Sequence, residues 1–253
     1  MTEPLVPEVV AKTDAGRSRT HNEDYVGQRI ERLPSGTVRS VLVVCDGMGG
    51  HPSGDGAAEI GGTTILDAAF RTGVEDSRER LRQAVIAANA AIVREGKLDP
   101  AKRGMGATCV AALLEGQALT VAHAGDCRAY LIDRTGIRRL TDDHSWVGEQ
   151  VRAGLLNERE AHESPYRSVV TRALGLDPAL EPDVRRHRLG SDDLLLLCSD
   201  GLWDVIDDET LREVVLGAPS IAEAADRLIA LANERGGPDN ISVVLARLGA
   251  SSG

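Results

Sequence analysis

The sequence predicts an α+β protein in which antiparallel sheets and helices pack in layers. Short apolar or β-branched segments, separated by Gly, Asp or Pro, are typical of strands. These segments come in runs, and so do the helical segments, which favours antiparallel layers over alternating βαβ units. The hydrophobic fraction of 42% over 253 residues allows a sizeable core, and with 2% aromatic residues we expect it to consist of Ala, Val, Leu and Ile. We expect one domain, residues 1–253.

The strand pattern occurs eight times. We expect strands at residues 8–13, 38–45, 108–114, 118–123, 128–132, 184–189, 193–198 and 241–248. Small and apolar residues recur at helical spacing in residues 53–71 and 77–95, which predicts two long helices. Two more helices are expected at residues 208–216 and 220–234. The last begins with Ser220 and has Glu223 three positions later, the pattern of a capping box.

Residues 145–176 differ from the rest of the chain, because they are charged and show no clear strand pattern. We expect an excursion from the core, a flap with short helices inserted in the single domain. Its arginines could form a solvated face, or they could help to dock a phosphoprotein. They are Arg152, Arg159, Arg167 and Arg172.

Composition limits the possible partners and location. The net charge of -10 argues against nucleic acid, because phosphate neutralisation needs a basic face. No secretory signal and no apolar run of about 20 residues is visible, so we expect a monomeric cytoplasmic protein without a membrane partner. A membrane anchor would require that this chain is part of a longer one. The four cysteines form no CxxC pair, which favours buried free thiols over disulfides or zinc ligands.

Aspartates follow or precede several strands in the company of glycine or asparagine. Asp46 directly follows the apolar run 41–45 and opens the sequence DGMGGH, Asp200 lies in SDG after a second apolar run, and Asp239 precedes the last strand. Each of the dipeptides Asp46-Gly47, Asp200-Gly201 and Asp239-Asn240, taken alone, more often forms a simple turn. Together they indicate carboxylates that converge at one sheet edge, and such carboxylates repel each other unless cations neutralise them.

Oxygen ligands without a Cys or His cluster favour magnesium or manganese over zinc or copper. Two such ions that share one carboxylate can hold a water between them and lower its pKa, which makes it a nucleophile for in-line attack on phosphorus. An arginine near the site would bind the phosphate oxygens in a bidentate manner. Arg19 is the candidate, since it lies on the same loop as Asp24.

Eight motifs in order then identify a family resemblance. They are DxGxxRxxNED at 14–24, DGMGGH at 46–51, GMGAT at 104–108, GDCRAY at 125–130, LTxDHS at 140–145, TRALG at 171–175, SDGLWD at 199–204 and DNISV at 239–243. The chain resembles the metal-dependent serine/threonine protein phosphatases of the protein phosphatase 2C type over nearly its whole length. The resemblance implies a stand-alone catalytic domain with a four-layer α-β-β-α sandwich, two antiparallel sheets flanked by helices.

The resemblance also implies the metal ligands. Asp46 would bridge two manganese or magnesium ions, and the carbonyl of Gly47 would complete the shell of one of them. Asp200 and Asp239 would hold the other. Asp126, together with Asp200, would form a third and weaker site.

Three further residues receive roles from the resemblance. Glu23 and Asp24 would act through coordinated waters or as outer acceptors of hydrogen bonds. Arg19 would bind the substrate phosphate. The reaction would be hydrolysis of phosphoserine and phosphothreonine in phosphoproteins, by attack of a metal-bridging water or hydroxide. The partners would include a serine/threonine kinase or its substrates.

One departure from the family pattern bears directly on the chemistry. Many eukaryotic members have a histidine after the Asp-Gly pair that protonates the leaving oxygen, and this chain has Met48 there. A metal-bound water or His51 would have to supply the proton, and we favour the water. We expect no catalytic role for His123, at the edge of the core, for His144, which would hydrogen-bond the loop before the flap, or for Trp203, a packing anchor.

Two other functions compete with a general phosphatase. A binding module on the same fold would recognise phosphoproteins without hydrolysing them, but such a module would lack metal ligands, and none is missing here. A narrower alternative keeps the chemistry and restricts the substrate to a switch protein such as an anti-anti-sigma factor. The sequence does not separate this alternative from a general antagonist of a kinase.

Overall fold

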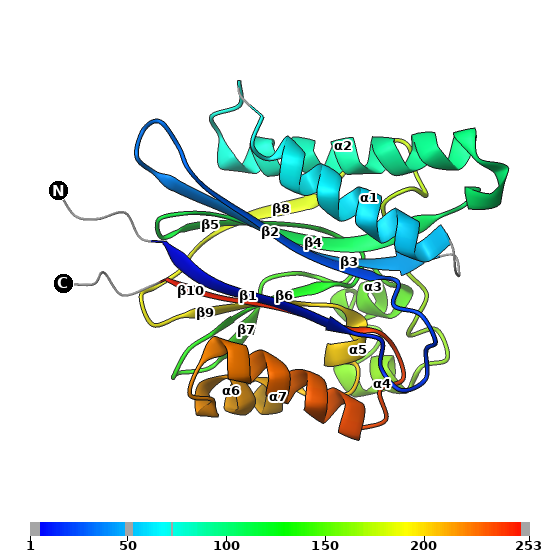
Figure 1. Cartoon of the computed structure of the whole chain (residues 1–253). Coiled ribbons are helices and arrows are strands. Elements are labelled where there is room, and N and C mark those ends of the chain that lie inside the picture. Colours follow the sequence, from blue (N-terminus) through cyan, green and yellow to red (C-terminus); the bar gives the residue numbers. More distant parts are fainter. Residues whose placement is uncertain (1–5, 49–52, 72, 249–253) are drawn as a thin grey trace.

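Two five-stranded antiparallel sheets stack on each other, and helices cover the outer face of each (Figure 1). The computed structural model describes residues 6–48, 53–71 and 73–248, so Gly49, Gly50 and His51 of the DGMGGH motif lie outside the described residues. The predicted four-layer α-β-β-α sandwich is confirmed.

The first sheet joins the start and the end of the described chain. Its order is β1 (Pro7–Asp14), β10 (Ile241–Leu248), β9 (Leu194–Cys198), β6 (Arg128–Ile132) and β7 (Ile137–Arg139). The second sheet has the order β2 (Asp24–Arg32), β3 (Val38–Met48), β4 (Gly106–Glu115), β5 (Ala118–Ala124) and β8 (Asp183–Arg188). All neighbouring strands in both sheets are antiparallel.

Helices form the two outer layers. α1 (Ser53–Ala68) and α2 (Ser77–Leu98) pack on the second sheet, and α6 (Asp208–Gly217) and α7 (Ile221–Glu234) pack on the first (Figure 1). A 3-10 helix, Pro100–Lys102, follows α2. The short helices α3 (Trp146–Arg152), α4 (Glu158–Glu163) and α5 (Asp200–Trp203) lie together at one end of the sandwich (Figure 1).

The central strands are buried on both faces, which explains their continuous apolar sequences. Leu42 and Val44 of β3 point into the layer between the sheets, whereas Val41 and Val43 of the same strand pack under α1 and α2. Successive side chains of a strand point to opposite faces, so a strand between two apolar layers has no polar positions. All four cysteines are buried and free, as expected.

Two strands were not predicted. β2 is an edge strand with no fully buried residue, and charged side chains interrupt its apolar pattern. β7 has only three residues, two of them arginines. The helix ends also differ from the expected ones, since α1 ends at Ala68 and α2 continues to Leu98.

The expected capping box of α7 forms only in part. Ser220 accepts the backbone N–H of Glu223 at 3.2 Å, but the carboxylate of Glu223 pairs with Arg227. A complete capping box is found instead on α4, between Asn157 and Glu160.

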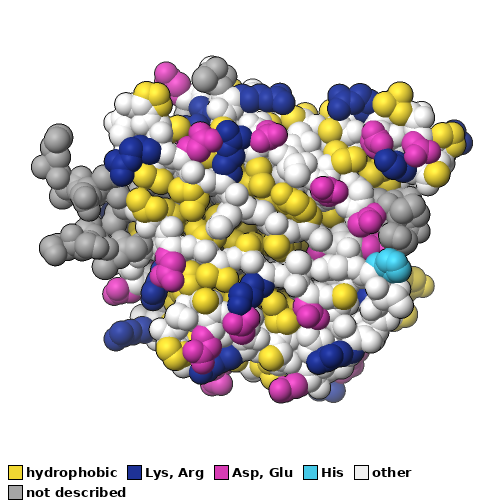
Figure 2. Space-filling view, in the orientation of Figure 1, with side chains coloured by type: hydrophobic (Ala, Val, Ile, Leu, Met, Phe, Trp, Pro, Cys, Tyr) yellow, Lys and Arg dark blue, Asp and Glu magenta, His cyan; other side chains and the backbone are white. Residues whose placement is uncertain are grey.

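Charged side chains of both signs are interspersed over the face shown in Figure 2. Several form ion pairs between elements, such as Lys12 with Asp226 and Arg29 with Asp67. Exposed pairs of this kind contribute little to stability. None of the described helices is long and apolar enough to span a membrane.

We expect Leu42→Ala to lower the free energy of unfolding by about 2–5 kcal/mol, because it leaves a cavity in the layer between the sheets. Leu42 has no exposed surface. Urea denaturation measures the change. Ile30→Ala on β2 is the control, since Ile30 is 38% exposed, and a loss for Leu42→Ala no larger than that of the control would contradict this account of the core.

Candidate metal centre

A cavity of about 470 Å³ lies at the end of the sandwich where β3 ends and β10 begins. We call it the carboxylate cavity. Predicted site residues from five separate parts of the chain line it: Arg19, Glu23, Asp46, Gly47, Asp126, Asp200 and Asp239. Asp24 is the only predicted site residue that does not line the cavity, and it lies behind the wall.

The pairing of the strands brings these residues together. Asp24 of β2 is directly opposite Asp46 of β3 in the second sheet. In the first sheet, Cys198 at the end of β9 pairs with Val243 on one side and with Arg128 on the other. Because β9 is antiparallel to both neighbours, its end lies beside their beginnings, and Asp200 therefore lies near Asp239 and Asp126.

Glycines allow the loops to approach each other at the cavity. A Cβ atom on Gly47 would lie 2.1 Å from the carbonyl oxygen of Gly54, and one on Gly201 would lie 2.1 Å from that of Asn240. Gly16 has φ +76° and would place a Cβ atom 2.2 Å from the carbonyl oxygen of Asp239. Any larger residue would push the loops apart, which accounts for the glycines in three of the motifs.

The carboxylates are close enough to raise each other's pKa values. Burial raises the pKa of Asp46 well above its usual value, and the charges of Asp24, Asp200 and Asp126 raise it further. Burial likewise raises the pKa values of Asp24, Asp126 and Asp200, with a neighbouring carboxylate contributing in each case. Protein surrounds Asp46 and Asp200 on all sides except the cavity.

Among the described residues, two buried carboxylate oxygens have no hydrogen-bond partner, namely Oδ1 of Asp24 and Oδ1 of Asp200. An unpaired buried acceptor is costly, and mutually repelling carboxylates add to the cost. A divalent cation with a preference for oxygen would satisfy these oxygens and neutralise the charge. The residues present therefore fit manganese or magnesium.

Hydrogen bonds hold the predicted ligands in place, and two of the residues that make them were not singled out from the sequence. Asn240 accepts the N–H of Glu23 at 2.8 Å and donates to the carbonyls of Ala15 and His21 at 3.0 and 2.9 Å. Ser199 donates to Oδ2 of Asp24 at 2.7 Å. Their positions inside the DNISV and SDGLWD motifs were the available signal.

Arg19 lies at the mouth of the cavity. Its side chain is 57% exposed, and its Nη2 donates to Oδ2 of Asp239 at 2.7 Å. This hydrogen bond raises the pKa of Arg19. The guanidinium is thus beside a predicted metal ligand, within reach of a phosphate that enters the cavity. His21 and Met48 also line the cavity, and His21 is another residue that the sequence did not single out.

Trp203 is a packing anchor, as expected. Its Nε1 donates to the carbonyl of Asp126 at 3.0 Å, and the guanidinium of Arg128 lies 3.5 Å from its ring centre. Arg128 in turn binds Asp143 at 2.6 Å. This chain of contacts fixes the backbone of Asp126 from the side of the first sheet.

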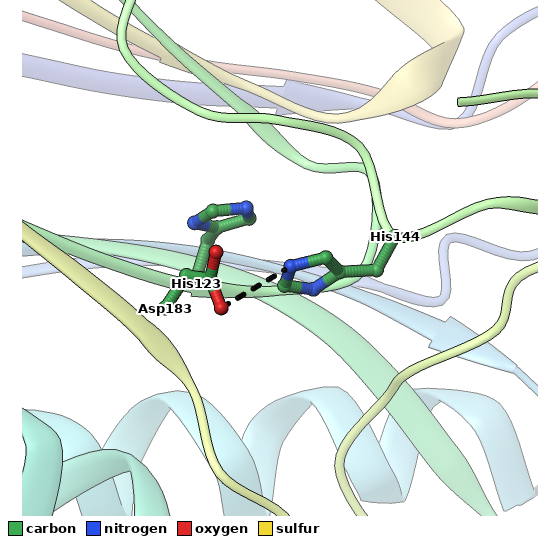
Figure 3. A group of neighbouring side chains, drawn as sticks. All are labelled: His123, His144 and Asp183. Atoms are coloured by element: carbon green, nitrogen blue, oxygen red, sulfur yellow. Dashed lines mark ion pairs between the residues drawn. The ribbon is translucent and has the colours of Figure 1, made fainter. Parts of the chain in front are cut away.

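His123, His144 and Asp183 form a second compact group with metal-ligating atoms (Figure 3). The two rings stack with centres 4.5 Å apart, and His144 Nε2 lies 3.6 Å from Asp183. Arg172 donates to Asp183 at 2.7 Å and lies 3.2 Å from His144 Nε2. Because this guanidinium already supplies the positive charge, the group is not a second cation site.

His144 instead holds the loop of Asp126. Its Nδ1 accepts the N–H of Gly125 at 3.2 Å, and its own N–H donates to the carbonyl of Gly125 at 2.9 Å. His144 also accepts the N–H of Thr171 through its carbonyl, at 2.8 Å. It therefore connects the Asp126 loop to both ends of the flap.

The fold and the converging carboxylates define a metal-dependent hydrolase. The sequence model of the family described as Protein phosphatase 2C matches residues 30–241. The serine/threonine phosphatase stp of Listeria welshimeri is 35% identical over 240 residues, which cover 92% of this chain and 93% of that protein. The chain belongs to the protein phosphatase 2C family, and it is a phosphoprotein phosphatase.

Solved structures agree with this assignment. The crystal structure of the Mycobacterium tuberculosis serine/threonine phosphatase PstP superposes with a TM-score of 0.87 at 37% identity, covering 97% of this chain and all of that one. The full-length PstP is longer, and the similar region is 45% of it. A structure of the PstP catalytic domain contains two manganese ions, with a TM-score of 0.85 at 35% identity. The predicted cofactor, manganese or magnesium, is confirmed.

We expect Mn²⁺ to stabilise the protein more at pH 8 than at pH 6. The raised pKa values, about 6 for Asp200 and about 8 for Asp126, mean that the folded metal-free protein binds more protons than the unfolded chain. Its stability therefore falls as the pH rises through these values, and Mn²⁺ competes with fewer protons at pH 8. Thermal denaturation with and without Mn²⁺ tests this, and an equal shift of the melting temperature at both pH values would contradict it.

A second pH effect is expected from His144. Burial, followed by the charges of His123 and Arg172, lowers its pKa to about 4, compared with about 6.5 in an unfolded chain. The unfolded state binds more protons between these values, so His144 contributes stability that is lost as the pH falls from 6.5 to 4.

His144→Asn should therefore flatten the rise of the unfolding free energy between pH 4 and 6.5, measured by urea denaturation. His162→Asn on α4 is the control, since the side chain of His162 is 62% exposed. If His144→Asn kept the slope of the wild type, the assigned role of the histidine would be wrong.

Proposed function

We propose that the carboxylate cavity hydrolyses phosphoserine and phosphothreonine in proteins, with manganese or magnesium as the cofactor. The observation that carries this proposal is the convergence of Asp46, Asp126, Asp200 and Asp239 on one cavity. The buried Oδ1 of Asp200, which has no hydrogen-bond partner among the described residues, supports it, because a divalent cation would satisfy that oxygen. The names of the relatives support the choice of phosphoserine and phosphothreonine.

Asp46 would be a ligand of two ions, and the carbonyl of Gly47 would be a further ligand of one of them. Asp200 and Asp239 would hold the second ion, and Asp126 with Asp200 would hold a third ion more weakly. The ions, when bound, supply a Lewis acid that lowers the pKa of a water for attack on phosphorus and neutralises the phosphate. Asp46 lies opposite Asp24 in the register of β2 and β3.

The remaining residues orient water or bind the substrate phosphate. Glu23 and Asp24 accept hydrogen bonds from waters at the metal centre, and Ser199 fixes the carboxylate of Asp24 for this task. Arg19 binds two phosphate oxygens with its planar guanidinium. Its present partner is Asp239, so the phosphate is held at the edge of the metal centre.

The leaving oxygen is protonated by water. Met48 lines the cavity at the position where a proton donor would be expected from the family pattern, and a thioether has no proton to give. The exposed side chain of Arg19 shows that solvent reaches the mouth of the cavity.

The proposal also covers the domain organisation, the location and the partners of the protein. We assign residues 1–253 to one catalytic domain with the flap at residues 145–176, acting as a cytoplasmic monomer. The phosphoproteins that it dephosphorylates would include a serine/threonine kinase or the substrates of that kinase. Removal of phosphate from such proteins would reverse a signal.

Asp46→Asn and Asp239→Asn should each lower kcat/KM for a phosphothreonine peptide by about a hundredfold or more, since even outer partners of metal ligands are worth about 10- to 100-fold. Excess chelator should abolish the activity of the wild type. The assay measures phosphate release with Mn²⁺.

The control variant is Asp226→Asn, which removes an exposed carboxylate that pairs with Lys12 far from the cavity. Its activity should equal that of the wild type. Full activity in both cavity variants, or activity that persists undiminished in excess chelator, would show that the assigned centre is wrong.

A further inference from the structure

Exposed apolar side chains are concentrated on the flap. The described part of the chain has nine large hydrophobic side chains that are exposed, and five of them lie in residues 145–176. They are Trp146, Leu155, Tyr166, Val169 and Leu176. The whole sequence has only six aromatic residues, and two of the six are in this set. A cluster of exposed apolar side chains on a soluble domain marks a surface that binds something.

Three of these residues form one patch. The rings of Trp146 and Tyr166 are in tilted contact, with centres 5.1 Å apart and planes at 57°. The backbone of Val169 connects them, because its carbonyl accepts the N–H of Trp146 at 2.8 Å and its N–H donates to the carbonyl of Tyr166 at 3.1 Å. We call Trp146, Tyr166 and Val169 the aromatic patch. Their exposed fractions are 37%, 56% and 46%.

The aromatic patch lies at the rim of the carboxylate cavity. Ser168 and Val170, the two neighbours of Val169 in the sequence, both line that cavity. Val170 also forms an antiparallel bridge with Ser145, the residue before Trp146. The patch is therefore joined, through the backbone of residues 168–170 and 145–146, to residues that line the cavity.

The aromatic patch is thus within reach of a polypeptide whose phosphate lies in the carboxylate cavity. The rings of Trp146 and Tyr166 are rigid and present a large apolar area, which is typical of residues that dominate binding surfaces. Within the described residues, neither the Tyr166 hydroxyl nor the Trp146 indole nitrogen forms a hydrogen bond. No hydrogen bond therefore fixes either ring in the fold.

We propose that the aromatic patch binds an apolar side chain of the substrate, a few residues from the phosphorylated serine or threonine. The enzyme would then prefer phosphorylated segments with an aliphatic or aromatic residue on that flank. This inference rests on the proposed function. The continuity of the patch with the cavity favours a substrate segment over a second copy of the chain as the occupant.

The test uses phosphothreonine peptides in which a single leucine is moved through the positions around the phosphothreonine, each matched by a peptide with serine instead. The wild type should hydrolyse the best leucine peptide with a kcat/KM about tenfold above its serine match, as partial burial of one leucine predicts. The double variant Trp146→Ala, Tyr166→Ala should lose this preference. Its activity on p-nitrophenyl phosphate, which has no flanking residues, should stay unchanged.

Two further variants make the test specific. Tyr166→Ser alone, at a 56% exposed residue, should lose part of the preference with no effect on folding, as circular dichroism would verify. Leu155→Ala removes an exposed apolar side chain of the same flap, 70% exposed and outside the patch, and should keep the full preference.

The inference would be overturned if the wild type showed no preference, or if the double variant kept it. It would also be overturned if the double variant changed a dimer into a monomer by light scattering while peptide selectivity stayed the same, since the patch would then bind a second copy. Equal hydrolysis of all peptides would overturn this inference but would leave the proposed function intact. Failure to hydrolyse any peptide or p-nitrophenyl phosphate with Mn²⁺ would overturn the proposed function as well.

Discussion

Repulsion among buried carboxylates is the constraint on which this structure depends. Asp24, Asp46, Asp126 and Asp200 lie so close together at one end of the sandwich that burial and mutual charge raise all their pKa values. Protons neutralise part of such a cluster, as the raised pKa values indicate, and a divalent cation would neutralise it without them. The Oδ1 atom of Asp200, which has no hydrogen-bond partner among the described residues, is an acceptor for such a cation. Metal binding would thus satisfy the site as well as supply the cofactor.

The rest of the molecule holds this unfavourable arrangement in place. Three apolar layers, one between the sheets and one under each pair of helices, fix the strands whose ends carry the ligands. At the cavity, glycines let the loops touch, and Asn240 joins the β1–β2 loop to the start of β10 through three hydrogen bonds. Trp203 and His144 secure the Asp126 loop from opposite sides. The predicted ligands are therefore held in place by contacts within the protein.

The flap connects the proposed substrate surface to the carboxylate cavity. His144 connects the Asp126 loop to Thr171 near the end of the flap, so the flap is attached beside the cavity. The short segment 168–170 contributes Ser168 and Val170 to the cavity lining and the exposed Val169 to the aromatic patch. A single stretch of backbone can in this way contribute to the wall of the reaction site and to the choice of substrate.

The sequence by itself determined the layered α+β class and eight of the strands, and its motifs predicted the residues that line the carboxylate cavity, because these features are local. Buried strands have apolar sequence patterns, and the predicted ligands lie in short motifs at strand ends. It did not reveal β2, whose half-exposed edge position leaves a polar pattern, or the roles of Ser199 and Asn240, whose partners are far away in the chain. Only the tertiary structure decided which strand ends meet and that Trp146 contacts Tyr166, because long-range strand pairing and the path of the flap set those distances.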